Sequence, residues 1–294
     1  MVHIKKRSTR NTIIAWASIG PICLYYLVFG LIPIAIVIYY GFFSQESVFS
    51  PYEFVGFGNY IEIFTQERYY QPFLNTLLFS VFTITISIVF GLLLAKLMTV
   101  PIRGQAFYRT VYYIPVVISM AVVAQIVNVW LSYNSGTINN IIVSFGGERI
   151  NWYYDTFWMY FWIIVICIWK GLGASIILFI AGLLGISNDI YEAADIDGAN
   201  ATNKFFKITL PQMRPIMVFV LITSIIGAFN IFEPVQLISS GGPNGTTNVL
   251  IYLIYNEAIQ NGNFGMGSSV AVLLLVILMA LTALSMKFNT NNNE

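Results

Sequence analysis

The chain has 294 residues, of which 57% are hydrophobic and only 9% are charged, and its formal net charge is +1. Soluble globular domains carry about 25% charged residues, so this composition excludes an ordinary soluble domain and indicates a polytopic membrane protein. A net charge so close to zero gives no indication of nucleic-acid binding, and no nucleic-acid partner is expected.

The residue types that most enzymes use for catalysis are scarce. Both cysteines, Cys23 and Cys167, lie inside apolar runs, where a disulfide or a thiolate metal site is not expected. His3 is the only histidine and lies in the tail, which excludes a histidine-rich metal site and argues against a Ser-His catalytic pair. The phosphate-binding pattern G-x-x-x-x-G-K-[ST] does not occur. We therefore expect a non-enzymatic chain with no catalytic residue, metal or cofactor of its own.

Six apolar windows follow a basic tail at residues 1–11. Each window is long enough to cross a hydrocarbon core, which needs about 20 helical residues. Pro21 and Pro33 predict kinks or a broken entry in the first window. The windows lie at about 13–40, 73–95, 111–131, 157–184, 215–238 and 268–286. These features predict an all-α fold with six transmembrane helices over residues 12–288 and a polar tail at 289–294.

The distribution of basic residues predicts how the helices are oriented. Cytoplasmic loops of membrane proteins are enriched in Lys and Arg. With a cytoplasmic N-terminus, only Arg68 and Arg149 of the 14 Lys and Arg residues fall outside, while Lys170 lies within a span. The others face the cytoplasm: Lys5, Lys6, Arg7, Arg10, Lys96, Arg103, Arg109, Lys204, Lys207, Arg214 and Lys287. This bias predicts that both termini and the loop at 185–212 are cytoplasmic.

The longest polar, helix-prone segment between two apolar windows is EAADIDGANATNKFFKITLP, at residues 192–211. Its first residues predict a helix that opens at Glu192, with Asp195 and Asp197 near the positive end of the helix dipole. Gly198 permits a turn after that helix. A short helix-turn-helix at the membrane surface is expected, and the residues that define it are Glu192, Ala193, Ala194, Asp195, Asp197, Gly198, Ile208, Leu210 and Pro211.

This spacing, E-A-A followed by Gly and then by I-x-L-P, resembles the cytoplasmic coupling loop of ABC importer permeases. In that family the loop docks into a groove on a separate ATPase subunit, so the resemblance implies that residues 192–198 form the docking helix. Small residues at Ala193, Ala194 and Ala199 would allow close backbone approach. The resemblance also implies the type I ABC importer permease fold, with ATP and Mg bound by the partner ATPase. The alternative is an ordinary interhelical loop without a partner.

Further segments resemble the carbohydrate-importer branch of these permeases, of the maltose, lactose and glycerol-phosphate type. They are FVGFGNY at 54–60, the Asn75-Thr76 pair, GQAFYRTVYYIP at 104–115 and GTIN at 136–139. An interfacial aromatic belt would also explain most of the tyrosines in the first of these. Within this branch the chain resembles the first of two paired permeases. The implied partners are a second permease, two ATPase subunits, an extracytoplasmic solute-binding protein and a sugar, an oligosaccharide, in the lipid of a prokaryotic cytoplasmic membrane.

Lys170 lies near the middle of a predicted span, about 13 residues or ~20 Å of helix from either end. A lysine at this depth is costly unless it faces a cavity or a partner. One interpretation places it on the substrate pathway with Trp169 and Gly171, since the W-x-G step borders the sugar site in maltose-type permeases. The alternative is a structural ion pair with Glu233.

Polar residues in two other windows are further candidates for substrate contacts. Asn230 and Glu233 are three residues apart in the fifth window, so one helix face would present an amide and a carboxylate to sugar hydroxyls. The resemblance implies that Ser224 and Asn230 contact the sugar, although a serine there could instead pack or bond to its own helix. Gln125 and Asn128 in the third window line the cavity or join neighbouring helices.

A proton-coupled or ion-coupled secondary transporter is the competing class. In that mechanism Lys170 and Glu233 would carry the coupling charge within the membrane. A secondary transporter, however, does not need a cytoplasmic docking helix built from small residues. The sequence therefore predicts a permease subunit of an ATP-driven sugar importer that works by alternating access and is coupled through residues 192–211.

Overall fold

The computed structural model describes residues 9–45, 49–100 and 104–290. Residues 1–8 of the predicted basic tail and 291–294 of the predicted polar tail lie outside the described residues. The described part is helical except for loops and one short antiparallel pair of strands, β1 (Phe43–Ser44) and β2 (Glu53–Phe54).

The α-helices are α1 (Thr9–Tyr26), α2 (Ile32–Tyr40), α3 (Gly58–Thr65), α4 (Glu67–Thr99), α5 (Gln105–Val117), α6 (Met120–Leu131), α7 (Thr137–Ser144), α8 (Thr156–Leu184), α9 (Asn188–Ile196), α10 (Ala201–Lys204), α11 (Leu210–Gln212), α12 (Arg214–Phe229), α13 (Leu250–Tyr255) and α14 (Phe264–Thr290). Short π-helical segments lie between or beside them: η1 (Leu27–Leu31), η2 (Phe205–Thr209), η3 (Val235–Ser239) and η4 (Asn256–Gln260).

Four helical stretches in the described part are long and apolar enough to cross a membrane: Trp16–Tyr40, Glu67–Thr99, Thr156–Leu184 and Phe264–Lys287. The number rises to six if each of two bent helix pairs forms one span. These pairs are Gln105–Val117 with Met120–Leu131, bent by 90°, and Ala201–Gln212 with Arg214–Phe229, bent by 64°. The predicted all-α, polytopic architecture is therefore confirmed, but two of its spans are not straight helices.

The third predicted window, 111–131, is the most strongly broken. Helix α5 ends at Val117, and the next residues, Ile118 and Ser119, have extended backbones before α6 begins. Pro115 in the last turn of α5 has no N–H to donate to the preceding turn. The predicted window is therefore occupied by two helices joined at a bend, a feature that length and hydropathy do not reveal.

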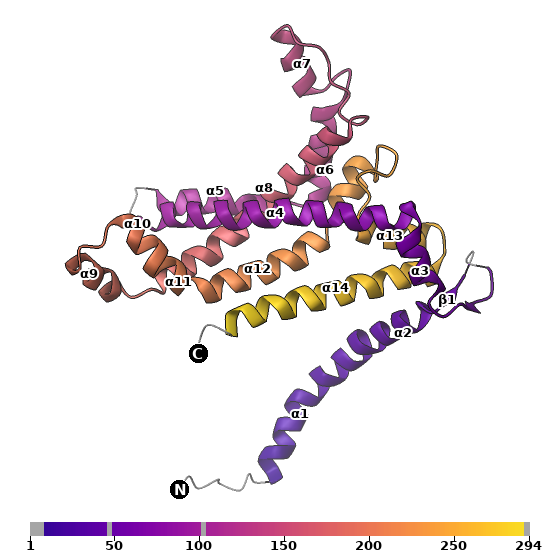
Figure 1. The fold of residues 1–294 in the computed structure, drawn as a ribbon, viewed down its shortest axis with the longest axis horizontal. Coiled ribbons are helices and arrows are strands. Elements are labelled where there is room, and N and C mark those ends of the chain that lie inside the picture. The colour runs from indigo at the N-terminus through magenta and orange to yellow at the C-terminus, as the bar shows by residue number, and fades with distance from the viewer. Residues whose placement is uncertain (1–8, 46–48, 101–103, 291–294) are drawn as a thin grey trace.

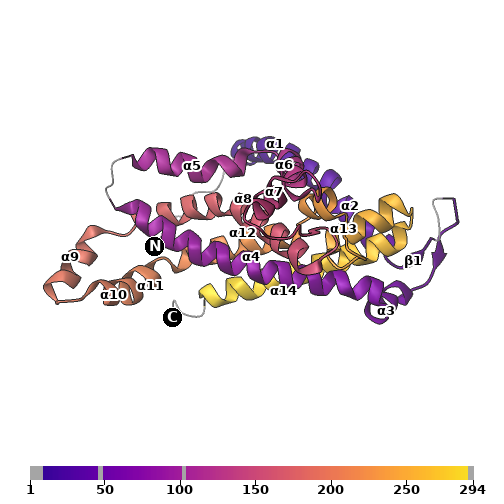
Figure 2. The ribbon, with the colours of Figure 1, turned by 90° about the horizontal axis from the view of Figure 1, so that it is seen from above.

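Helices α4, α8, α12 and α14 lie roughly alongside one another and form the body of the molecule (Figures 1 and 2). Within this body Phe79, Ile163 and Phe179 are completely buried. In lipid, close packing rather than exclusion of water holds helices together, so small residues at helix contacts matter. Gly173 of α8 is such a residue, because a Cβ there would lie 2.2 Å from the carbonyl oxygen of Tyr112 in α5.

Helices α1 and α2 form an arm that leaves the body beside α14 (Figure 1). None of its most apolar window is buried within the chain. Side chains such as Trp16, Leu24 and Phe29 are largely exposed, so this span meets lipid or another subunit along its length. The π-helical segment η1 precedes Pro33, whose missing N–H leaves one turn of the helix without its usual hydrogen bond.

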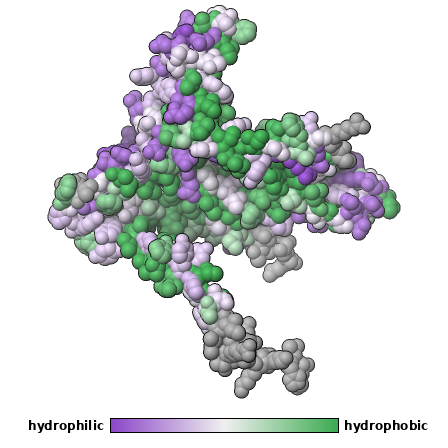
Figure 3. Space-filling model, turned by 180° about the vertical axis from the view of Figure 1, so that it is seen from behind, coloured by the Kyte–Doolittle hydropathy of each residue, from purple (hydrophilic) through white to green (hydrophobic). Residues whose placement is uncertain are grey.

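The two ends of the body differ in composition. One end carries α9 to α11, and the other carries the strands, α3 and α13 (Figure 1). A space-filling view shows hydrophobic residues across the middle, with hydrophilic residues at the ends and on the projecting α6–α7 arm (Figure 3). An apolar middle between polar ends is the pattern expected of a protein that crosses a bilayer.

Polar residues of the carbohydrate-branch motifs serve as anchors for loops. The buried Asn59 amide donates to the carbonyls of Gly41 (3.2 Å) and Phe43 (2.8 Å). The Asn75 amide donates to the carbonyl of Asn248 (2.7 Å). Neutral amides can satisfy buried backbone groups without bringing charge into the protein. The motifs therefore fix the loops that surround α3 and α13.

The same principle organises the α6–α7 arm. Asn139, which is fully buried, donates to the carbonyls of Tyr133 (3.2 Å) and Ile150 (2.9 Å) and accepts from the Ile150 N–H (3.0 Å). Trp152 packs in the same cluster as residues of α6 and the first turns of α8. One amide thus holds the segments on both sides of α7 together.

Candidate functional site

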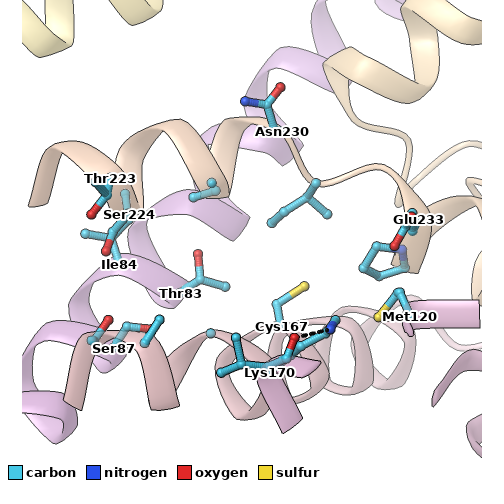
Figure 4. A pocket seen from close by; sticks show the side chains of 18 of the residues that line it. Thr83, Ile84, Ser87, Met120, Cys167, Lys170, Thr223, Ser224, Asn230 and Glu233 are labelled. Atoms are coloured by element: carbon cyan, nitrogen blue, oxygen red, sulfur yellow. Dashed lines mark hydrogen bonds between the residues drawn. The ribbon is translucent and has the colours of Figure 1, made fainter. Parts of the chain in front are cut away.

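A cavity of about 600 Å³ lies between α4, α8 and α12, near the bend that follows α5. Figure 4 shows side chains from these helices pointing into it. Its polar and sulfur-bearing lining residues are Thr83, Ser87, Met120, Cys167, Lys170, Ser175, Thr223, Ser224, Asn230 and Glu233. The rest of the lining is apolar, and hydroxyls are the commonest polar groups in it; hydroxyls both donate and accept hydrogen bonds. The cavity therefore suits a ligand that is itself rich in hydroxyl groups.

Lys170 lies in this cavity, but its ammonium group already has partners. Nζ donates to the carbonyl oxygens of Ile118 (2.6 Å), Val116 (3.3 Å) and Pro115 (3.4 Å). These carbonyls lie at the end of α5, where the 90° bend leaves backbone acceptors without helical donors. The ion pair with Glu233 that we considered is not formed. Lys170 instead stabilises the bend between α5 and α6.

Asn230 and Glu233 do not share a helix face, so that expectation was wrong. Helix α12 ends at Phe229, and the Asn230 amide donates back to the carbonyl of Ile226 (2.8 Å). The physical reason is Pro234, which has no N–H to donate to the carbonyl of Asn230 and whose ring would clash with it. Figure 4 shows the Asn230 side chain pointing away from Lys170. Glu233 lies further along the segment that follows α12.

Thr223 and Ser224, adjacent in α12, differ in how available their hydroxyl groups are to a ligand. Thr223 donates to the carbonyls of Phe219 (3.0 Å) and Val220 (3.0 Å) of its own helix, so its proton is already used. Ser224 lines the cavity and is only partly buried. The structure therefore places Ser224 where a ligand hydroxyl could reach it, in agreement with its predicted position.

Sequence reasoning missed the contribution of α4 and of Ser175 in α8. Thr83 and Ser87 lie one helical turn apart on α4 and line the cavity while remaining almost fully buried. Ser80 occupies the preceding turn of the same helix face. Small hydroxyl residues spaced by three or four positions on an otherwise apolar helix are a recognisable signal. That periodicity would have identified this face from the sequence.

Three predicted contact residues lie outside the cavity lining. Trp169 and Gln125 are exposed on the surfaces of α8 and α6. The Asn128 amide donates to the carbonyl of Leu237 (3.0 Å), and its oxygen accepts from the hydroxyl of Tyr153 (2.9 Å). Burial raises the pKa of Tyr153, so this phenol remains a hydrogen-bond donor to a higher pH than an exposed tyrosine does. Asn128 therefore joins neighbouring segments, which was the alternative interpretation. Gly171, by contrast, lines the cavity as expected.

The predicted helix-turn-helix is present, but its first helix starts earlier than predicted. Helix α9 begins at Asn188, where the Ser187 hydroxyl accepts from the N–H of Asp189 (3.3 Å). Glu192 is therefore in the middle of the helix, and Asp195 is near its negative C-terminal end. The expectation that Glu192, Asp195 and Asp197 lie near the positive end of the helix dipole was wrong. The helix begins at its N-cap Ser187, five residues before Glu192, and not at Glu192 itself.

The turn after α9 matches the prediction. Gly198 has φ +73°, a left-handed conformation that glycine adopts without strain. The Ala199 N–H bonds to the carbonyl of Ala194 (2.9 Å), and the Gly198 N–H bonds to that of Asp195 (3.1 Å). This is the usual hydrogen-bond pattern of a glycine-terminated helix. It directs the chain from α9 into α10.

Two side-chain contacts hold the two halves of this motif together. Lys204 forms an ion pair with Asp195. The hydroxyls of Tyr191 and Thr209 lie 2.9 Å apart. These two contacts join α9 to the segments that follow it, which makes the α9–α11 motif one unit at one end of the body.

The surface of the motif has a distinct outer face. Glu192, Ala193, Asp197 and Gly198 are exposed, and the Ile196 side chain is 88% exposed. Ala194 is buried against the chain itself, so it is not available for the close approach that we expected of it. Of the I-x-L-P residues, Ile208 and Leu210 are partly buried and Leu210 packs against the core that joins α4, α8 and α12, whereas Pro211 is exposed.

A protein-family model described as a binding-protein-dependent transport system inner membrane component matches residues 87–290. The probable ABC transporter permease protein YesP of Bacillus subtilis is 32% identical, over 96% of this chain and 93% of that protein. The arabinooligosaccharides transport system permease protein AraP of Halalkalibacterium halodurans is 29% identical, over 96% of this chain and 91% of that protein.

The fold is also similar to that of a solved transporter subunit. A chain in the crystal structure of a bacterial alginate ABC transporter, in complex with an alginate pentasaccharide-bound periplasmic protein, matches with a TM-score of 0.82. The match covers 94% of this chain and 93% of that chain at 22% sequence identity. At this identity the similarity establishes the permease fold and nothing finer.

Proposed function

Because the chain belongs to the family of binding-protein-dependent transport system inner membrane components, we propose that it is the permease subunit through which an oligosaccharide crosses the cytoplasmic membrane of a prokaryote. AraP, a relative of similar length, is named for transport of arabinooligosaccharides. The alginate transporter, similar in fold, has a carbohydrate as its cargo. Both names support a carbohydrate as the transported class.

The observation that carries this proposal is the cavity between α4, α8 and α12, whose apolar wall carries several hydroxyl groups. Thr83, Ser87, Ser175 and Ser224, among mainly apolar residues, line a space of about 600 Å³ in the apolar middle of the molecule. Pockets for small ligands range from about 300 to 1,000 Å³, so a few sugar units fit. Binding in the middle of the membrane is what alternating access requires.

Transport is powered from outside this chain. We infer that α9 docks against a separate ATPase subunit through its exposed residues Glu192, Ala193, Asp197 and Gly198. Two such ATPases would bind ATP and Mg, while this chain binds no nucleotide or metal and catalyses no reaction. Closure of the ATPase pair would move the α9–α11 motif as one body, and the long helices α4, α8 and α12 would follow it.

The complete importer would contain two further kinds of partner. A second permease would complete the pathway, and an extracytoplasmic solute-binding protein would deliver the sugar, as the periplasmic protein in the alginate transporter complex suggests. The distribution of Lys and Arg supports an orientation with α9–α11 and both termini in the cytoplasm. The solute-binding protein would then meet the end that carries α3 and α13.

The competing mechanism, a proton-coupled secondary transporter, needs an intramembrane charge free to change its partner. Its two candidates were Lys170 and Glu233. The hydrogen bonds from Lys170 to three carbonyls at the α5 bend do not support such a role.

The proposal is tested by uptake into vesicles that contain the purified assembly. Vesicles loaded with ATP would be mixed with the solute-binding protein and a radiolabelled sugar from a panel of oligosaccharides, monosaccharides and polyol phosphates. Uptake of an oligosaccharide that stops when ATP is replaced by ADP is the expected result. ATP-dependent uptake of a non-carbohydrate solute, with none for any sugar, would refute the assigned substrate class.

A further inference from the structure

A second cavity, of about 480 Å³, lies beneath the α9–α11 motif. Its walls come from the last turn of α4, the end of α8, and the inner sides of α9, α10 and η2. It is separate from the translocation cavity, with which it shares no lining residue among those described. Its position between two spans and the motif that couples them makes its contents important for coupling.

The charges on its walls favour an anion. Lys96 and Lys204 both line the cavity, and no acidic residue is among the described residues that do so. Lys204 is paired with Asp195 of α9, which offsets its charge. Lys96 has no carboxylate partner in the described part of the chain, and its Nζ lies 4.0 Å from the centre of the Phe205 ring. An aromatic face holds an ammonium group in place but leaves its hydrogen-bond donors available.

The remaining walls combine polar and apolar groups. Thr99, Asn188 and Tyr191 supply hydroxyl and amide groups. Leu183 and Leu184 supply an apolar side, and Leu184 is 63% exposed, so this side is open to the surroundings. Such a mixture matches a molecule that has a charged head and an apolar body.

The position of the cavity at the ends of two candidate membrane spans favours a lipid. Lys96 lies in the last turn of α4 and Leu184 is the last residue of α8, and both helices are candidate membrane spans. The end of a span is where lipid headgroups lie, and basic pockets between helices on the cytoplasmic side are favourable sites for anionic lipids.

We propose that this cavity binds the phosphate headgroup of an anionic phospholipid, with Lys96 as the main ionic contact. The Asn188 amide donates to the phosphate or glycerol oxygens, the Tyr191 hydroxyl keeps its bond to Thr209, and the acyl chains leave past Leu184. A lipid held in this way bridges α4 and α8 to α9, and it therefore stabilises the position from which α9 transmits movement. Transport by the assembly accordingly depends on anionic lipid as well as on substrate.

The binding test uses the full chain, purified with the subunits that accompany it, in vesicles without sugar or solute-binding protein. One set contains phosphatidylcholine alone, a second a roughly three-to-one mixture of phosphatidylcholine with phosphatidylglycerol, and a third the same mixture with added inorganic phosphate. Mass spectrometry then counts the lipids retained after detergent extraction. Retention of phosphatidylglycerol in preference to phosphatidylcholine is expected, whereas equal retention overturns the proposal.

Variants locate the site. Lys96→Gln is expected to lower phosphatidylglycerol retention about fivefold, from the typical contribution of one basic residue at an anionic surface. Lys96→Arg should restore it. Lys287→Gln is the matched control, since it removes a lysine at the end of another span with the same change in net charge. Equal retention by Lys96→Gln and wild type would overturn the assignment to this cavity.

The vesicles with added inorganic phosphate distinguish a bound lipid from a bound soluble phosphate. If inorganic phosphate displaces retained phosphatidylglycerol at equal concentration, the cavity binds a free phosphate and the lipid assignment is wrong. Because lipid retention is measured without any transported solute, its outcome does not depend on the proposed sugar specificity. The wild-type comparison remains decisive even if Lys96→Gln fails to assemble.

Discussion

The Nζ atom of Lys170 in α8 lies 2.6 Å from the carbonyl oxygen of Ile118, at the bend between α5 and α6. This contact explains how a charged side chain is tolerated in the middle of a membrane span. The free carbonyl acceptors at the end of α5 and the partly buried ammonium donor of α8 satisfy each other. The bend and the lysine are therefore parts of one arrangement.

Replacement of Lys170 by methionine is expected to destabilise the protein by about 1.5–3 kcal/mol, since hydrogen bonds to a charged group are lost while the apolar stem is kept. Thermal unfolding of the purified chain in detergent measures this effect. Lys170→Arg, which retains donors, should lose less. A Lys170→Met variant as stable as wild type would show that this contact does not hold the bend.

Gly173 tests the close packing of α5 on α8. A Cβ at this position would lie 2.2 Å from the carbonyl oxygen of Tyr112, so Gly173→Ala should force the helices apart at a cost of about 1–3 kcal/mol. Gly171→Ala is the matched control, because a Cβ there meets no atom within 4 Å and alanine favours a helix. Unfolding temperatures that fall equally for both variants would contradict the packing argument.

Gly198 tests the coupling motif. Its φ of +73° disfavours a β-branched residue, so Gly198→Val should disturb the turn after α9 and abolish sugar uptake while the protein still inserts into the membrane. Gly146→Val is the control, since Gly146 has φ +83°, similar open space around it and a position on the α6–α7 arm. Normal uptake by Gly198→Val in a membrane-inserted protein would refute the coupling role.

The adjacent residues Thr223 and Ser224 of α12 test whether the cavity binds the sugar. Ser224→Ala should raise the KM for sugar uptake about fivefold, since a typical hydrogen bond contributes about 1 kcal/mol. Thr223→Val should have a smaller effect, because that hydroxyl already bonds to its own helix. The KM for uptake of radiolabelled sugar separates the two. If Thr223→Val has the larger effect, Ser224 is not the residue that faces the ligand.

The architecture was predictable from the sequence because it depends on local properties. Apolar windows of sufficient length correspond to spans, and the E-A-A…G pattern marks the α9–α10 turn, which Gly198 forms as expected. Hydropathy alone, however, could not show that α12 ends at Phe229 or that α5 and α6 meet at 90°. These breaks depend on prolines and, at the bend between α5 and α6, on the donor that the neighbouring helix α8 provides to the freed carbonyls.

The candidate site was only partly predictable for a related reason. Ser224 and Gly171 line the cavity as expected, and Thr83 and Ser87 were overlooked although their helical spacing was visible in the sequence. The partner of Lys170 could not be inferred, because its acceptors are backbone carbonyls brought close by tertiary packing. Side-chain chemistry identifies which groups need partners, whereas the fold determines which partners they find.

ATP hydrolysis by the purified assembly in lipid, with and without its solute-binding protein and sugar, tests the central claim most directly. The account predicts that this chain purifies with an ATPase whose activity rises when the binding protein and one oligosaccharide are both present. Failure of any ATPase to purify with the chain, together with proton-dependent sugar uptake by the chain alone, would contradict it.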